Sequence, residues 1–133
     1  MDILLVEDNA GDAELMRIAL SEARPDVELR VAWDGEEALA LLMEGDVPDL
    51  VLLDLNLPRL SGHEVLAALR AARVPHVRRL PVVVLTTSGD PDDVRRSYEL
   101  FASSHIVKPH ELDELFAVAA SIARYWFETV ALP

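Results

Sequence analysis

At 133 residues, of which 51% are apolar and 27% charged, the chain is long enough for one globular domain and too short for two. The absence of cysteine excludes disulfides, thiol catalysis and thiolate metal sites. Its net charge of −12 argues against direct nucleic-acid binding, because phosphate backbones repel an acidic surface.

Short apolar runs alternate with amphipathic stretches along the chain. The first run, Ile3–Val6, follows an acid and is far shorter than a signal-peptide core or a membrane span, so we predict a cytoplasmic protein with no membrane contact. Ile3–Val6, Leu50–Leu53 and Val82–Leu85 are apolar throughout, as expected of central parallel strands covered on both faces. The predicted strands are Ile3–Val6, Val27–Ala32, Leu50–Leu53, Pro81–Leu85 and His105–Val107.

Helix-start signals lie between these strands. We expect Asn9 to cap the first helix. Asp34 and Ser61 each precede a glutamate by three residues, the spacing of a capping box, and Asp90 precedes a proline. The alternation predicts a doubly wound (βα)5 domain of the α/β class, with a parallel five-stranded sheet and helices on both faces. The core face of the first helix is predicted to comprise Leu15, Ile18, Ala19 and Ala23.

Acidic and polar side chains stand where the predicted strands end. Glu7 and Asp8 follow the first strand, and Asp54 follows the third. Thr86 follows the fourth and Lys108 follows the fifth. The carboxyl ends of parallel strands meet at one edge, so three carboxylates converge there if the first and third strands are neighbours. Helix capping would explain any one of these acids, but not the whole set together.

The crowding of these carboxylates has an energetic consequence. Two unit charges ~4 Å apart repel by about 4 kcal/mol at an effective dielectric of about 20. Lys108 alone cannot offset three such pairs, so either a carboxyl stays protonated or a divalent cation binds. An oxygen site with few protein ligands and room for water suits Mg²⁺ better than Ca²⁺.

Four motifs, in order, make the chain resemble the receiver domains of two-component response regulators over essentially its whole length. They are Ile3–Asn9, Leu52–Gly62, Pro81–Thr86 and Lys108-Pro109. Within that family the chain is most similar to the single-domain regulators of cyanobacterial and bacterial phytochromes, on Glu7–Asp12, Leu85–Ser88, Tyr125–Phe127 and Leu132-Pro133. The resemblance implies a flavodoxin-like receiver domain spanning residues 1–133, with a C-terminal extension at about residues 125–133.

The resemblance also implies a role for each site residue. Asp54 would accept a phosphoryl group from a sensor histidine kinase, for which a bacteriophytochrome is the candidate. Lys108 would pair with the phosphoryl group and Thr86 would donate a hydrogen bond to it. A metal and a lysine supply the charge stabilisation that phosphoryl transfer needs. The ligands implied for Mg²⁺ are Glu7, Asp8, Asp54 and the backbone carbonyl of Asn56.

Two positions depart from the family pattern. His105 stands three places before the lysine, where the family usually has a tyrosine or phenylalanine. We expect His105 to fill this switch position together with Thr86, not to bind metal, and to make the phosphorylated state sensitive to pH near neutrality. Phe101-Ala102 replaces a common Gly-Ala turn, which predicts extra packing or a local change after the fourth helix.

The last helix is apolar nearly all round. A core-facing stripe is predicted at Leu112, Leu115, Phe116, Ala119, Ile122 and Ala123. Further apolar residues lie outside that stripe, and a helix of this kind should be covered on both sides. We therefore predict a homodimer that pairs through the last helix and the C-terminal segment. The predicted contact residues are Val118, Tyr125, Phe127, Val130 and Leu132.

The predicted function is a phosphoacceptor switch whose phosphorylation changes protein–protein interactions. It is not a turnover enzyme, although it would catalyse its own phosphorylation and dephosphorylation. The alternative is a pseudo-receiver, an interaction module without phosphorylation, which the intact Asp54, Thr86 and Lys108 disfavour and His105 favours. A flavin- or nucleotide-binding domain lacks support, because no glycine-rich loop follows the first strand.

Overall fold

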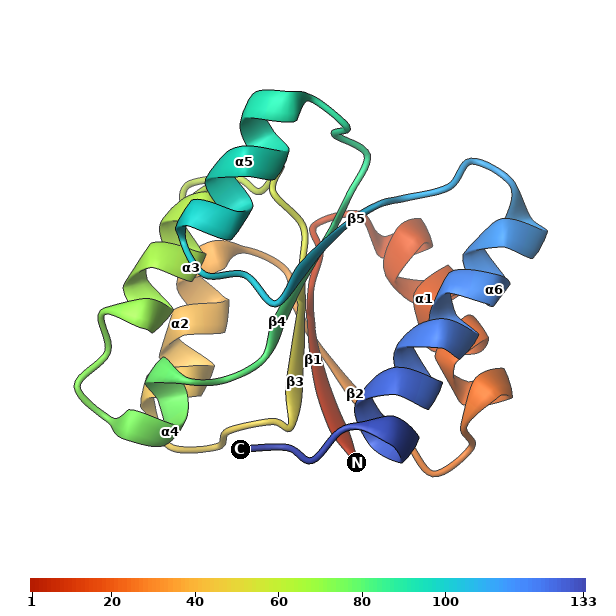
Figure 1. Cartoon of the computed structure of the whole chain (residues 1–133), viewed down its shortest axis with the longest axis horizontal. Helices are drawn as coiled ribbons and strands as arrows, with labels where there is room; N and C mark the ends of the chain where they lie inside the picture. Colours follow the sequence, from red (N-terminus) through yellow and green to blue (C-terminus); the bar gives the residue numbers. More distant parts are fainter.

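The computed structural model describes residues 1–133 and has a five-stranded parallel sheet between two layers of helices (Figure 1). All strand pairings are parallel and the order is β2-β1-β3-β4-β5, so the predicted doubly wound fold is confirmed. The order also places β1 beside β3, as the predicted carboxylate cluster requires. The strands are β1 (Asp2–Val6), β2 (Glu28–Ala32), β3 (Leu50–Leu53), β4 (Val82–Thr86) and β5 (Ser104–Val107).

The helices divide between the two faces of the sheet. Helices α1 (Ala10–Ala23) and α6 (Leu112–Arg124) pack together on one face. The other face carries α2 (Gly35–Met43), α3 (Gly62–Arg70) and α5 (Pro91–Glu99), as Figure 1 shows. A short α4 (Pro75–Arg78) precedes β4 and was not predicted, because four residues are too few to show a helical period.

Two hydrophobic cores lie on the two faces of the sheet. Successive strand residues alternate between them: Leu4 and Val6 enter one core, while Ile3 and Leu5 enter the other. The residues of β3 and β4 are buried throughout, as predicted for central strands. No helix of the structure is long and apolar enough to cross a bilayer.

The predicted helix caps are present. The side chains of Asn9 and Asp90 accept hydrogen bonds from backbone N–H groups in the first turns of α1 and α5. Ser61 forms a complete capping box with the glutamate of the first turn of α3. Asp34 caps α2, but the carboxylate of Glu37 accepts from the N–H of Trp33 instead of completing the box.

The predicted core face of α1 was partly wrong. Leu15 and Ile18 are exposed, and Ala23 is also on the solvent side. The buried residues are Ala13, Met16, Ala19 and Leu20. The buried face is therefore centred on Met16 and Leu20, and Leu15 and Ile18 lie outside it.

The prediction that the last helix has a surplus apolar face for a partner was also partly wrong. Val118 and Phe127 pack against the core between α1, α6 and the sheet, so they are not free for a partner. The guanidinium of Arg24 on α1 lies 5.7 Å from the centre of the Phe127 ring and donates to the Phe127 carbonyl. Leu112, predicted to face the core, is 53% exposed.

The C-terminal segment continues the last helix instead of leaving it. A π-helical turn, η1 (Tyr125–Thr129), follows α6 directly. Of the predicted dimer contacts, only Tyr125 is largely exposed, while Val130 and Leu132 are half-buried. Phe101 makes no extra packing: its side chain is 74% exposed, and its backbone φ of 64° is the local change that replaces the expected glycine.

Candidate functional site

Three carboxylates meet at the carboxyl edge of the sheet. Glu7 and Asp8 follow β1 and Asp54 follows β3, and these strands pair so that Val6 lies opposite Leu53. Each of the three acids has an oxygen within 4.8 Å of an oxygen of the others. The sequence prediction that these residues converge is therefore correct in geometry.

Gly62 sets how closely α3 approaches this site. A Cβ at residue 62 would collide with the backbone of Asp54 and Leu55. The Gly62 N–H also donates to the Leu55 carbonyl at 3.0 Å. Only a glycine permits the helix to start against the end of the strand that carries Asp54.

Lys108 reaches into the cluster from the end of β5. Its Nζ donates to Glu7 Oε2 at 2.6 Å and to Asp54 Oδ2 at 3.4 Å, and Asp12 Oδ2 lies 3.7 Å away. The Lys108 backbone N–H donates to the Thr86 carbonyl at 2.7 Å, which fixes the start of the side chain. Asp12 had no predicted contact with the lysine; its position on the first turn of α1 brings it to this edge.

The charges of this site oppose one another. Burial raises the pKa of Glu7 even though Lys108 acts in the opposite direction. Burial would lower the pKa of Lys108, but the hydrogen bond to Glu7 and the charges of Asp54, Glu7 and Asp12 together raise it. Lys108 therefore stays an ammonium, and it remains outnumbered by the acids around it.

The other two predicted ligands, Asp8 and the Asn56 carbonyl, agree with a site for a hard cation. Asp8 is exposed and belongs to none of the ion pairs around Lys108. The Asn56 N–H donates to Asp54 Oδ1 at 3.2 Å, which holds the loop that carries the Asn56 carbonyl beside Asp54. Because the donors are carboxylate and carbonyl oxygens without nitrogen or sulfur, the set fits Mg²⁺ or Mn²⁺.

Thr86 and His105 lie in a hydrogen-bonded region beside this cluster. The Thr86 side chain is buried, and its Oγ1 accepts a hydrogen bond from the Ser88 N–H at 3.4 Å. The His105 ring contacts Ser97 Oγ at 2.9 Å and the Ser88 carbonyl at 3.0 Å, and it contacts none of the three clustered acids. Ser97 was missed by sequence analysis, because its contact with His105 depends on how α5 lies beside β5.

Known proteins are similar to this chain in sequence and in fold. Residues 3–120 match the family described as the response regulator receiver domain. The response regulator Rcp1 of Synechocystis sp. is 44% identical over an alignment that covers 98% of this chain and 92% of Rcp1.

Two solved structures are similar over nearly the whole chain. The phosphorylated cyanobacterial phytochrome response regulator RcpA has a TM-score of 0.93 and 40% identity, covering 99% of this chain and 97% of RcpA. The Mn²⁺-bound form of Rcp1 has a TM-score of 0.89 and 43% identity, covering 99% of this chain and 98% of Rcp1. With the fold, the acidic edge and the sequence in agreement, the chain belongs to the response regulator receiver domain family.

Proposed function

We propose that this chain is a phosphoacceptor switch in which Asp54 takes a phosphoryl group from a phosphohistidine of a sensor histidine kinase. The observation that carries the proposal is the buried Asp54 carboxylate, clustered with two other acids and 3.4 Å from the Lys108 ammonium. In the transfer, an Asp54 oxygen bonds to phosphorus while the phosphorus–nitrogen bond breaks, and the kinase imidazole, protonated on its other ring nitrogen, leaves as neutral histidine. The chain turns over no other substrate, but it catalyses its own phosphorylation and dephosphorylation.

Mg²⁺ is the proposed cofactor, held by Glu7, Asp8, Asp54 and the Asn56 carbonyl. When bound, it supplies neutralising charge for the acids and for the phosphoryl oxygens. The Mn²⁺-bound form of Rcp1 supports a divalent cation in a relative of this chain. The excess of carboxylates over ammonium groups at the edge of the sheet gives the same requirement on physical grounds.

Lys108 and Thr86 are proposed to hold the phosphoryl group. The Lys108 ammonium already lies between Glu7 and Asp54, so it can exchange a carboxylate oxygen for a phosphoryl oxygen with a small movement. The Thr86 hydroxyl has its own proton to donate, because in the present arrangement its oxygen only accepts from the Ser88 N–H. Phosphorylation would draw this hydroxyl and its loop toward Asp54 and so change the surface that partners contact.

A groove beside Lys108 is the proposed docking site for the kinase. It has a volume of about 360 Å³ and its lining includes Leu15, Pro109 and Leu112. Leu15 and Leu112 are large apolar residues that are exposed, and the groove also contains the Lys108 side chain. A helix carrying the phosphohistidine could cover these residues and present its phosphorus to Asp54. Because RcpA is a phytochrome response regulator, we propose a phytochrome-type kinase as the donor.

Incubation with acetyl phosphate and Mg²⁺, followed by intact-mass measurement, tests the phosphoacceptor function. We expect a gain of one phosphoryl group that disappears in Asp54→Asn and in EDTA. Glu22→Gln, which removes an exposed acid on α1 far from the strand ends, is the matched control and should be labelled like wild type. Equal labelling of Asp54→Asn would refute the site, and an unlabelled wild type would favour the pseudo-receiver.

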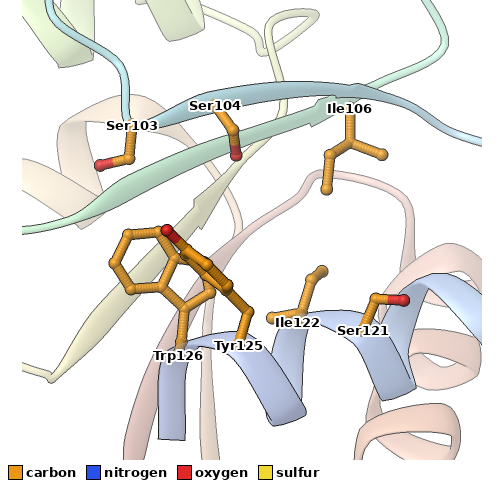
Figure 2. Close-up of a pocket in the computed structure, with 7 residues that line it drawn as sticks. All are labelled: Ser103, Ser104, Ile106, Ser121, Ile122, Tyr125 and Trp126. Carbon is orange, nitrogen blue, oxygen red and sulfur yellow. The ribbon is translucent and has the colours of Figure 1, made fainter. Parts of the chain in front are cut away.

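Homodimerisation is proposed through the outer surface of the last helix. Figure 2 shows the rings of Tyr125 and Trp126 facing β5 across a pocket, which has a volume of about 320 Å³. The two rings pack edge to face at 5.2 Å, so Tyr125 is held in place although it is 52% exposed. A fixed, exposed aromatic residue is a favourable anchor for an interface, and two-fold pairing is the default for identical chains.

Light scattering on the full chain tests this assembly. We expect a dimer at tens of micromolar that dissociates in Tyr125→Glu. Phe101→Glu, in the turn after α5, is the matched control, because Phe101 is an exposed aromatic residue outside the last helix. A monomeric wild type, with and without phosphorylation, would refute the proposal.

A further inference from the structure

A chain of hydrogen bonds leads from the Thr86 hydroxyl to helix α3. The Ser88 N–H donates to Thr86 Oγ1, and the Ser88 carbonyl lies 3.0 Å from Nε2 of His105. The other ring nitrogen of His105 lies 2.9 Å from Ser97 Oγ, which in turn lies 3.1 Å from Nε2 of His63. Ser97 and His63 are buried, so the far end of this chain is closed to water.

The donors and acceptors in this chain follow from chemistry. A carbonyl only accepts, so Nε2 of His105 carries a hydrogen and donates to Ser88. In neutral His105 the Nδ1 atom is then an acceptor, and the Ser97 hydroxyl donates to it. Nε2 of His63 carries a hydrogen and donates to Ser97 Oγ.

His105 can take up a proton without losing any of these contacts. In the imidazolium form Nδ1 becomes a donor to Ser97 Oγ. The Ser97 hydroxyl then turns its own hydrogen to the Asp93 carbonyl, which lies 3.0 Å away. The Ser97 hydroxyl is therefore a rotor that satisfies His105 in both protonation states, which a tyrosine or phenylalanine at residue 105 could not use.

Titratable and charged groups on α3 and α5 face the His105 ring. His63 faces it from α3, while α5 contributes Asp93, Arg96 and the Tyr98 hydroxyl, which accepts from the His105 backbone N–H. Burial, followed by the charge of Arg96, lowers the pKa of His63. His63 therefore stays a neutral donor over the range in which histidines titrate.

We propose that Ser97 and His63 are positioning residues for His105, and that protonation of the His105 ring fixes the Ser88 loop and, through this loop, the Thr86 hydroxyl. The inference rests on the proposed phosphoacceptor function and adds a regulatory input to it. An imidazolium donates a charge-assisted hydrogen bond to the Ser88 carbonyl, which is stronger than the neutral one. Acid pH should therefore hold the loop in place, keep Thr86 Oγ1 on the Ser88 N–H and slow phosphorylation.

The test compares pH profiles of the initial phosphorylation rate with acetyl phosphate and Mg²⁺. Between about pH 8 and about pH 5.5, wild type should slow about fivefold relative to His105→Tyr. Ser97→Ala should lose most of this extra slowing, because protonated His105 then lacks its acceptor. His76→Gln removes an exposed histidine on α4 outside the network and should keep the wild-type profile. Glu7 and Lys108 are present in every variant, so their titration cancels in these ratios.

Ser97→Cys provides a second variant in case the buried alanine substitution unfolds the chain. Its thiol keeps a similar volume but is a weak donor and acceptor, so the extra slowing should again be reduced. Identical profiles for wild type and His105→Tyr would overturn the inference, as would full slowing in a folded Ser97→Ala or Ser97→Cys protein. These outcomes are separable from failure of the proposed function, which would appear as no labelling of wild type at about pH 8.

Discussion

Two partly buried cations, Lys108 and Arg70, lie at opposite edges of the same sheet. Lys108 lies at the carboxyl edge and faces Glu7, Asp54 and Asp12, so its partners carry more charge than it can neutralise. Arg70, at the end of α3, donates only to neutral backbone carbonyls. They are the carbonyls of Arg78, Leu80 and Phe101.

The difference separates a structural cation, Arg70, from Lys108, which is proposed to be the functional cation. The carbonyls around Arg70 join the ends of α3, α4 and α5 to the start of β4, and burial is the sole cause that lowers the pKa of Arg70. The acids around Lys108 repel one another, and either a further cation or a proton on one carboxyl would relieve that repulsion. Repulsion between like charges lowers the stability of the fold, and it is expected at sites where a bound ligand relieves it.

Removing the Arg70 guanidinium should have the largest effect on the free energy of unfolding. Arg70→Met removes the donors to three backbone carbonyls, so we expect a loss of about 3 kcal/mol in the free energy of unfolding. Arg95→Met, whose exposed guanidinium pairs only with Asp92 on the same helix, should cost less than about 0.5 kcal/mol. Urea unfolding of both variants measures the difference. Equal midpoints would show that the Arg70 contacts add no more than a surface ion pair.

Removing the Lys108 ammonium should lower the free energy of unfolding by a smaller amount, and this loss should depend on metal. Lys108→Met leaves Glu7 and Asp54 without a counter-charge, but Glu7 can take up a proton instead of staying charged. We therefore expect a loss of about 2 kcal/mol without metal near neutral pH. Saturating Mg²⁺ should recover part of this loss in Lys108→Met, but none of the loss in Arg70→Met. The check is urea unfolding in EDTA and in Mg²⁺. A metal-free Lys108→Met protein as stable as wild type would contradict the comparison.

The pH dependence of stability should mark the same edge of the sheet. Burial raises the pKa of Glu7 in the folded chain, so the folded protein binds a proton at Glu7 more tightly than the unfolded chain does. The stability that this proton contributes is complete below the unfolded pKa of 4.5. It is lost as the pH rises through the folded pKa. Metal-free wild type should therefore lose stability relative to Glu7→Gln as pH increases above about 4.5. Thermal melting of both proteins across this window measures the difference. A stability difference that does not change with pH would show that Glu7 is not destabilised by burial.

The sequence predicted the strands, and it predicted the acidic edge on the condition that the first and third strands are neighbours. It did not predict which apolar side chains remain exposed. Short, continuous apolar runs and the caps at Asn9 and Ser61 are local signals, and parallel pairing then places strand-end residues together. The outward turn of Leu15, the burial of Phe127 under Arg24 and the Ser97 contact with His105 depend on helix packing angles. Sequence spacing carries no such information, because each contact joins elements that are distant along the chain.

The smallest expected effect comes from the acid that has no cation beside it. Asp8 is exposed and takes part in none of the ion pairs with Lys108, so Asp8→Asn removes repulsion without breaking a favourable contact. Solvent screens this repulsion, and we expect metal-free stability to rise by only about 0.5 kcal/mol. The same substitution removes a proposed Mg²⁺ ligand, so the rise in melting temperature on adding Mg²⁺ should shrink.

The opposite signs of these two effects make the Asp8 experiment decisive. Glu22→Gln, an exposed acid on α1, should change neither the metal-free melting temperature nor the Mg²⁺ response by a comparable amount. A general gain from lowering the net charge of −12 would raise both variants equally, whereas crowding at the strand ends raises only Asp8→Asn. A lower metal-free melting temperature in Asp8→Asn would contradict the crowding. An unchanged Mg²⁺ response would remove Asp8 from the proposed ligands while leaving the charge conflict between Glu7, Asp54 and Lys108 in place.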